Sequence, residues 1–393
     1  MTIAMRSLLT LAKLSSRRVG SRYSRSFAHG SLLTEAARSG EGGHVRTMKL
    51  WQMIACALLC AGHLGAQQPD IDQNEAGHTP IISGGLGYIH NVDGGITSLE
   101  PIIEPVLLVP FGSHVLLESR TDFTGFFQRE NGTSGPFKGK VFKNVEFAQV
   151  DWLASTYVMV TAGKYLLPFG LFNERSQPIW IRNLQDAPIN VAIGTRTSGA
   201  GDGFMLRGVA SQTPSHTVQY TAYFSARSNI NQLQAARTAG GDVSIFMLNS
   251  RMEIGTSYQR FLQQQQINSV ATYLSWQPPQ FPLNLKAEYD YSHYGRGYWV
   301  EAAYQDQTEK VPAFLRRAQV VGRVQESIPL HGGGNGLPRV DTRRVDLGLN
   351  YYFRDNLRFV SSYGRQFSSQ ANANIWNVGF TYRFLFPLWP GRK

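Results

Sequence analysis

The chain has 393 residues, of which 38 are Lys or Arg and 27 are Asp or Glu, giving a formal charge of +11. Residues 1–66 hold nine of the basic and two of the acidic side chains, so the remainder carries 29 and 25, a charge of +4. This small excess does not support nucleic-acid binding. Aromatic residues make up 12% of the chain and one apolar run stands out, near residue 55, which disfavours disorder and a helical membrane protein.

Residues 48–66 have the features of a secretory signal peptide. They combine a Met-Lys start, an apolar stretch over 50–64 and a small-residue exit, so we expect cleavage after Ala66. Both cysteines of the chain, Cys56 and Cys60, fall in this segment, and the mature protein would therefore have no thiol. A lipoprotein signal, with one of these cysteines lipidated, is the less favoured alternative.

The remaining boundaries follow from composition and pattern. Residues 1–47 are rich in Arg and Ser and poor in acid, as in a transit peptide, but a secretory signal that begins at residue 48 indicates a wrongly chosen start codon upstream. We expect 1–47 to be a disordered extension and 67–80 to be a periplasmic segment. A β-barrel domain is predicted over 81–385, with a tail at 386–393.

From residue 81 onward, apolar and polar residues alternate in runs of about 10 between turn residues. The pattern predicts sixteen strands, an even number, at 81–90, 99–109, 113–128, 140–152, 156–165, 202–211, 216–226, 242–251, 254–264, 267–276, 283–294, 297–306, 315–325, 341–353, 356–367 and 374–385.

Connections between these strands alternate in length. Tight turns fall at 110–112, 213–215, 278–280 and 354–356, and long loops at 129–139, 166–201, 227–241 and 326–340. Short periplasmic turns and long extracellular loops are typical of an all-β transmembrane antiparallel barrel, whereas a soluble β-sandwich needs no such asymmetry.

The two faces of the strands favour the same fold. In 341–353, Leu347 and Leu349 alternate with Asp346 and Asn350. Charged side chains inside a membrane-length strand must face water, so we expect a wet interior and a lipid-facing exterior. Strand 140–152 has apolar residues on both faces, which indicates a bulge or a misassigned strand.

Two motifs carry a family resemblance. One is Ala162-Gly163-Lys164 continuing through Pro168-Phe169-Gly170 at the start of the third long loop, and the other is Leu347-Gly348-Leu349-Asn350-Tyr351-Tyr352 in the penultimate hairpin. Together with the aromatic final strand, they resemble the phosphate-selective porin O and P family. The resemblance implies a sixteen-stranded, usually trimeric outer-membrane porin whose third loop, here 166–201, folds into the lumen as a constriction.

Basic side chains are the candidates for the pore constriction. They are Lys164, Arg175, Arg182, Arg196, Arg207, Arg317, Arg323, Arg344 and Arg358. If they lack acidic partners, the +4 charge predicts a weak preference for anions, including phosphate-like ones. The alternative is that the arginines tether the loop to the wall through salt bridges, in which case their charges largely cancel.

The expected function is passive diffusion of small hydrophilic solutes through a bacterial outer-membrane porin. Its expected partners are outer-membrane lipid, the assembly machinery and two further copies of the chain, with no nucleic acid. No catalytic constellation, metal-ligand spacing or cofactor motif stands out, so we expect no enzyme and no cofactor. The competing interpretations are a phospholipase-like barrel hydrolase and a barrel plugged by its own loops, with a structural or adhesive role.

Overall fold

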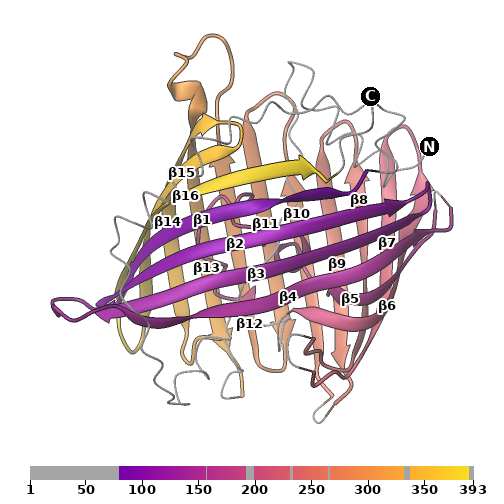
Figure 1. Cartoon of the computed structure of the whole chain (residues 1–393), viewed down its shortest axis with the longest axis horizontal. Helices are drawn as coiled ribbons and strands as arrows, with labels where there is room; N and C mark the ends of the chain where they lie inside the picture. The colour runs from indigo at the N-terminus through magenta and orange to yellow at the C-terminus, as the bar shows by residue number, and fades with distance from the viewer. Residues whose placement is uncertain are drawn as a thin grey trace.

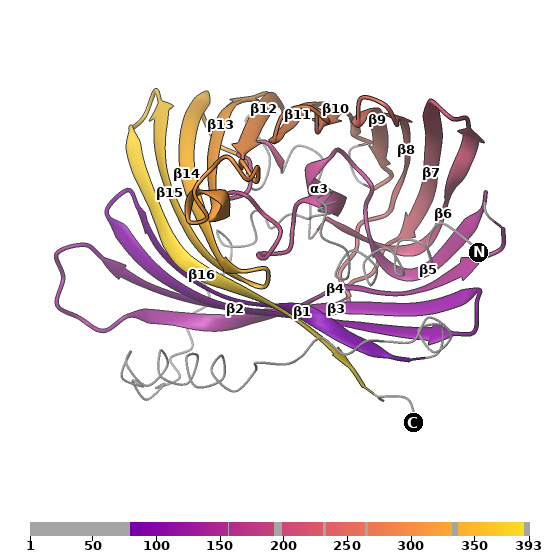
Figure 2. The same ribbon diagram turned by 90° about the horizontal axis from the view of Figure 1, so that it is seen from above.

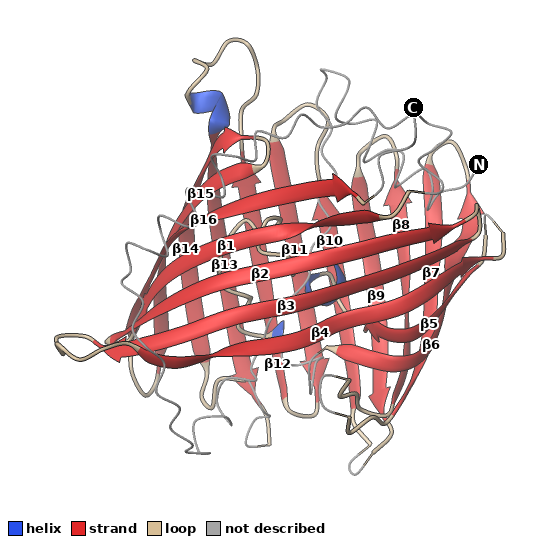
Figure 3. Ribbon diagram, in the orientation of Figure 1, coloured by secondary structure: helices blue, strands red, loops and turns tan. Residues whose placement is uncertain are grey.

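A computed structural model of the chain describes residues 79–155, 157–191, 199–230, 233–263, 266–331 and 337–388, in which β-strand is the main secondary structure (Figures 1 and 3). The predicted extension 1–47, the signal peptide 48–66 and most of 67–80 lie outside the described residues. The described residues also form two short helices, α3 (Phe172–Arg175) and the 3₁₀ helix η3 (Leu315–Arg317).

In these ranges the chain forms sixteen strands: β1 (Ile81–Asp93), β2 (Ile96–Phe111), β3 (Val115–Glu130), β4 (Lys138–Leu153), β5 (Met159–Leu166), β6 (Ala200–Gln212), β7 (His216–Ala226), β8 (Thr238–Met247), β9 (Met252–Phe261), β10 (Asn268–Trp276), β11 (Leu283–Ser292), β12 (Gly295–Tyr304), β13 (Ala318–Pro329), β14 (Thr342–Arg354), β15 (Leu357–Ser368) and β16 (Ala373–Pro387). Each predicted strand corresponds to one of these.

The strands close into a barrel. Each pairs antiparallel with its neighbours in sequence, and β1 pairs with β16 from Ile81 opposite Pro387 to Asp93 opposite Ile375. In Figure 1 the near strands β1–β4 run across the far strands, as strands tilted about a barrel axis do. Closure leaves no unpaired sheet edge, which a bilayer requires of any β-structure that spans it.

The distribution of side chains is the reverse of that in a soluble protein. On β14, Leu347 and Leu349 are 61% and 48% exposed, whereas Asp346 and Asn350 are 2% and 0% exposed. Most positions on the other strands follow the same rule, with apolar residues outside and polar residues inside, but a few apolar side chains such as Ile89, Tyr273 and Trp299 are buried inside the barrel. An apolar exterior of this kind needs lipid around it, so the predicted all-β transmembrane barrel of sixteen strands is confirmed.

One strand begins earlier than predicted, and a glycine in its added part leaves space for a tyrosine ring of the neighbouring strand. Strand β8 starts at Thr238, four residues before the predicted 242, and includes Gly240 and Gly241. A Cβ on Gly240 would lie 2.5 Å from the hydroxyl oxygen of Tyr223 on β7, so only glycine permits this ring to lie against the wall. Glycine pairs usually indicate a turn, and here they are part of a strand.

Another strand begins later than predicted. Strand β13 starts at Ala318 rather than at 315, because a helical turn takes up residues 315–317 after Pro312, whose carbonyl accepts the N–H groups of Leu315 and Arg316. The connection 305–317 is therefore long, although it lies on the same rim as the tight turns 112–114 and 355–356. The predicted difference in length between the two rims holds for most connections. The exceptions are this long connection and, on the opposite rim, the two-residue turns 94–95 and 293–294.

Strand β4 contains the predicted bulge. The register of β3 with β4 shifts between Arg120 and Thr121, which lie opposite Phe147 and Val145, so Glu146 is the additional residue. Both Glu146 and Phe147 are buried, at 1% and 9% exposure. The bulge thus turns a carboxylate and an aromatic ring into the lumen from adjacent positions, which explains why both faces of this strand look apolar in the sequence.

Candidate functional site

The longest described connection folds into the barrel. The connection from β5 to β6 is described over 167–191 and at 199, and Figure 2 shows α3 and its neighbouring segment within the ring of strands. The two ends of this lumenal loop are fastened together by Asn173, whose amide nitrogen donates to the carbonyls of Leu167 at 2.6 Å and Gly199 at 3.0 Å. The loop therefore leaves and re-enters the wall at one place.

A glycine and a carboxylate position the start of α3. The chain turns at Gly170 with φ of +67°, and a Cβ there would lie 2.6 Å from Glu288 Oε1 on β11. The other oxygen of Glu288 accepts the backbone N–H groups of Leu171 and Phe172, the latter at 3.0 Å. Because these donors have no partner within so short a helix, the carboxylate satisfies them. This gives the Pro-Phe-Gly motif a structural role.

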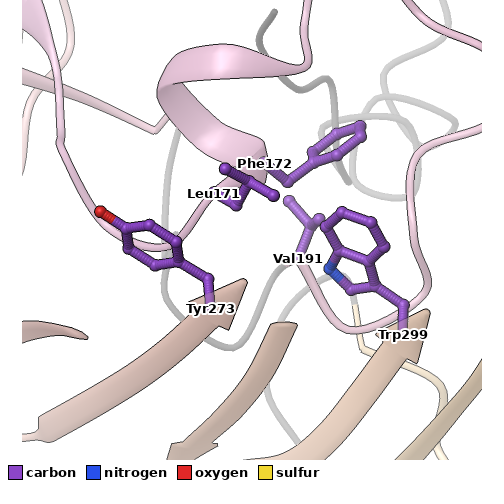
Figure 4. Close-up of a cluster of buried hydrophobic side chains, with 5 residues drawn as sticks. All are labelled: Leu171, Phe172, Val191, Tyr273 and Trp299. Carbon is purple, nitrogen blue, oxygen red and sulfur yellow. The ribbon is translucent and has the colours of Figure 1, made fainter. Parts of the chain in front are cut away.

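Apolar contacts hold the same part of the loop against the far wall (Figure 4). Leu171, Phe172 and Val191 of the loop pack with Tyr273 of β10 and Trp299 of β12. The rings of Phe172 and Trp299 meet edge to face, with centroids 6.1 Å apart. Burying each large side chain stabilises the packed loop by about 1.5–3 kcal/mol, so the loop is a fixed part of the interior.

The middle of the loop reaches the opposite wall. Ile179 packs with Ile89 of β1 and Ile102 of β2. Its backbone is held as well, because its N–H donates to Glu104 Oε2 at 3.2 Å and its carbonyl accepts from Arg358 Nη2 at 2.9 Å. The lumenal loop thus crosses the interior and is attached on both sides.

Salt bridges fix the charged side chains of the loop. Arg175 Nη1 lies 2.6 Å from Glu253 Oε1 of β9, and Glu174 Oε1 lies 2.6 Å from Arg207 Nη2 of β6. Burial is the largest single effect and lowers the pKa of Arg175, but Glu253, Tyr273 and Glu174 together outweigh it and hold that pKa above its usual range. Arg182 instead donates to the carbonyls of Gln177 at 2.5 Å and Gln185 at 2.8 Å, and burial lowers its pKa.

Asp186 attaches the end of the loop to β13, β14 and β16. Its carboxylate forms an ion pair with Arg344 and accepts from Asn377 Nδ2 at 3.1 Å, while its carbonyl accepts from Arg323 Nη1 at 3.0 Å. Arg344 and Arg323 also lie 2.6 Å and 3.3 Å from oxygens of Asp346. Burial is the largest single effect and raises the pKa of Asp186, but Arg344, Arg323 and Asn377 together outweigh it and hold that pKa below its ordinary value.

The predicted constriction residues therefore have several locations. Arg175, Arg182, Arg207, Arg323, Arg344 and Arg358 contact the lumenal loop or belong to it, and Lys164 is buried at the start of the loop. Arg317 lies in η3, outside the strands, where it is exposed and donates to the carbonyl of Phe353 at 3.0 Å. Arg196 lies outside the described residues.

The carboxylates that hold the loop were not among the predicted site residues. They are Glu104, Glu253, Glu288, Glu301 and Asp346, which bind loop backbone, loop amides or the arginines beside them. Strand alternation already indicated that Glu288 and Asp346 face inward. Alternation did not indicate their partners. Those of Glu288, the backbone N–H groups of Leu171 and Phe172, lie more than a hundred residues away in the sequence.

The described part of the chain contains no group of three or more His, Cys, Asp or Glu side chains arranged to hold a metal ion. None of its helices is long and apolar enough to cross a membrane.

Comparisons with known proteins are informative at the level of structure. No protein-family model and no curated protein sequence matches the chain. Among solved structures it is similar to Salmonella typhi OmpF in complex with daunomycin, with a TM-score of 0.52 and 12% identity over 78% of this chain and 98% of that one. It is also similar to Pseudomonas putida OprB, with a TM-score of 0.51 and 10% identity over 78% and 91% of the two chains.

A third similar structure is a loop-deletion mutant of OmpT, an outer membrane protein of Vibrio cholerae, with a TM-score of 0.50 and 11% identity over 78% and 99% of the two chains. At these identities the likeness concerns the fold. The fold and the apolar exterior together identify the chain as a sixteen-stranded β-barrel of the bacterial outer membrane.

Proposed function

We propose that this protein is a porin, a water-filled channel through which small hydrophilic solutes diffuse passively across the outer membrane. The observation that carries the proposal is the lumenal loop, which is fixed to a polar inner wall by salt bridges and hydrogen bonds. A loop held within a barrel of sixteen strands narrows the lumen without requiring any moving part, and the narrowest section decides which solutes pass.

Planar-bilayer recording tests this function. The purified full chain, added to a solvent-free bilayer in 1 M KCl (about a 3 Å Debye length, so surface charge is screened), should produce stepwise, long-lived current increments. Liposomes containing the protein should also swell in small sugars and not in large oligosaccharides. A chain that inserts, resists SDS as a folded barrel and yet conducts no ions would contradict the proposal.

The same observation favours one alternative, a plugged barrel. Because the loop contacts both β1–β2 and β10–β13, it could close the lumen rather than narrow it. Single-channel conductance separates the two functions, since a plugged barrel would show no steps until part of the loop is deleted.

The proposal also covers the family of the protein and its oligomeric state. Membership of the phosphate-selective porin O and P family rests on the two sequence motifs, and assembly as a homotrimer follows from that resemblance. The proposed activity is transport and not catalysis. The expected weak anion preference rests on lumenal arginines without acidic partners; the salt bridges of Arg175, Arg207 and Arg344 remove much of that support.

A further inference from the structure

The inner surface of β8–β12 is rich in carboxylates. Five acidic side chains of these strands face the lumen, whereas one basic side chain, Lys286, does so among the residues that the structure describes. The five, called the acidic wall below, are Asp242, Glu253, Glu288, Asp290 and Glu301. Their inward direction follows from the alternation of burial along each strand, since Val243, Ile254, Tyr289 and Val300 beside them are 40% exposed or more.

Most of the acidic wall is already engaged. Glu253 pairs with Arg175 at 2.6 Å, Glu301 lies 3.8 Å from Arg323, and Glu288 accepts backbone N–H groups of the loop. Asp290 is 1% exposed and accepts from the amide of Asn190. These four carboxylates are therefore screened by partners or covered by the lumenal loop.

Asp242 differs from the other four. Its bonds come from two neutral hydroxyls, Ser257 Oγ at 2.7 Å and Tyr273 Oη at 3.0 Å, and it forms no ion pair within 4.0 Å in the described residues. It is also half-buried rather than covered. Neutral donors orient a carboxylate but do not cancel its charge, so Asp242 keeps a negative field in the lumen.

The environment of Asp242 is built into the wall. Tyr273 can reach it across β9 because Gly255 has no side chain, and a Cβ at Gly255 would lie 2.2 Å from Tyr273 Cζ. The cation Arg175, which lies 5.5 Å above the Tyr273 ring, is itself committed to Glu253. The ion pair of this loop arginine is thus formed with another acid.

We propose that the acidic wall makes the channel prefer small cations to anions of similar size, and that Asp242 contributes the largest part of this preference. The inference rests on the proposed porin function and names its favoured solutes. It reverses the preference expected from the sequence for two reasons. Four of the arginines behind that expectation have carboxylate partners, namely Arg175, Arg207, Arg323 and Arg344. The acidic wall also holds five carboxylates against one lysine, Lys286.

Reversal potentials in a KCl gradient test the inference. The wild-type channel should show a K⁺/Cl⁻ permeability ratio above one. Asp242→Asn keeps the size and one hydrogen-bond acceptor, and should lower the ratio by about threefold, as expected for one charge at ~7 Å in water-like surroundings. The matched control is Asp306→Asn, in the turn between β12 and β13, where Asp306 Oδ1 accepts the N–H of Thr308 at 2.9 Å; this change should leave the ratio unaltered.

Arg175→Gln provides a second test that does not depend on the folding of the first variant. Removing this cation frees Glu253 and should raise the ratio. A wild-type permeability ratio below one would overturn the inference, and so would a ratio that stays unchanged in both Asp242→Asn and Arg175→Gln. Because the permeability ratio is measured on open channels, such results leave porin function intact, whereas absence of conductance refutes the porin proposal itself.

Discussion

Asp186→Asn should loosen the lumenal loop without unfolding the barrel. The wild-type carboxylate forms a charge-assisted bond with Arg344, an interaction that is usually worth about 1.5–3 kcal/mol. Its side chain is 25% exposed and Arg344 retains Asp346, so we expect the substitution to cost less than most of this range, about 1–2 kcal/mol. A change of this size increases the population of the detached loop about 5- to 30-fold.

Single-channel recording measures this population as brief excursions from the main open current. The matched control is Glu326→Gln, which breaks an ion pair with Arg343 on the outer face of the wall, where Arg343 is 75% exposed and the pair contributes about 0–1 kcal/mol. Excursions should be more frequent in Asp186→Asn and unchanged in Glu326→Gln. Equal frequencies in the two variants would refute the argument that the ion pair holds the loop.

Three further predictions concern pH, the loop turn and the lipid face. The pKa of Asp186 is lowered in the folded protein, so the ion pair that tethers the loop should be present above about pH 4 and be lost as pH falls through the folded-state pKa. Wild-type recordings at that low pH should become like those of Asp186→Asn. The variant itself should respond little to acid. Gly170→Val introduces a Cβ at 2.6 Å from Glu288 and should make the loop sensitive to protease while the barrel stays resistant to SDS. Leu347→Arg, at a position 61% exposed to lipid, should cost about 2–4 kcal/mol and lower the denaturant midpoint in micelles, whereas Leu347→Val should not.

The wall of the barrel could be predicted from the sequence because strand alternation is a local property. A period of two decides which side chains share a face, and it correctly separated Leu347 and Leu349 from Asp346 and Asn350 before any partner strand was known. The strand count and closure followed from the same repeat. Boundaries were less certain where glycine has a packing role, as at Gly240, because the ring that requires it comes from another strand.

The interior was decided by contacts between distant parts of the chain. Composition supplied the arginines but could not show that Arg175 meets Glu253, or that Arg344 meets Asp186, 158 residues away in the sequence. The sign of the lumenal field depends on which charges are paired, and pairing is fixed only when the loop is folded inside the closed barrel. A local pattern therefore determined the wall, while the tertiary structure determined which charges remain to act on a solute.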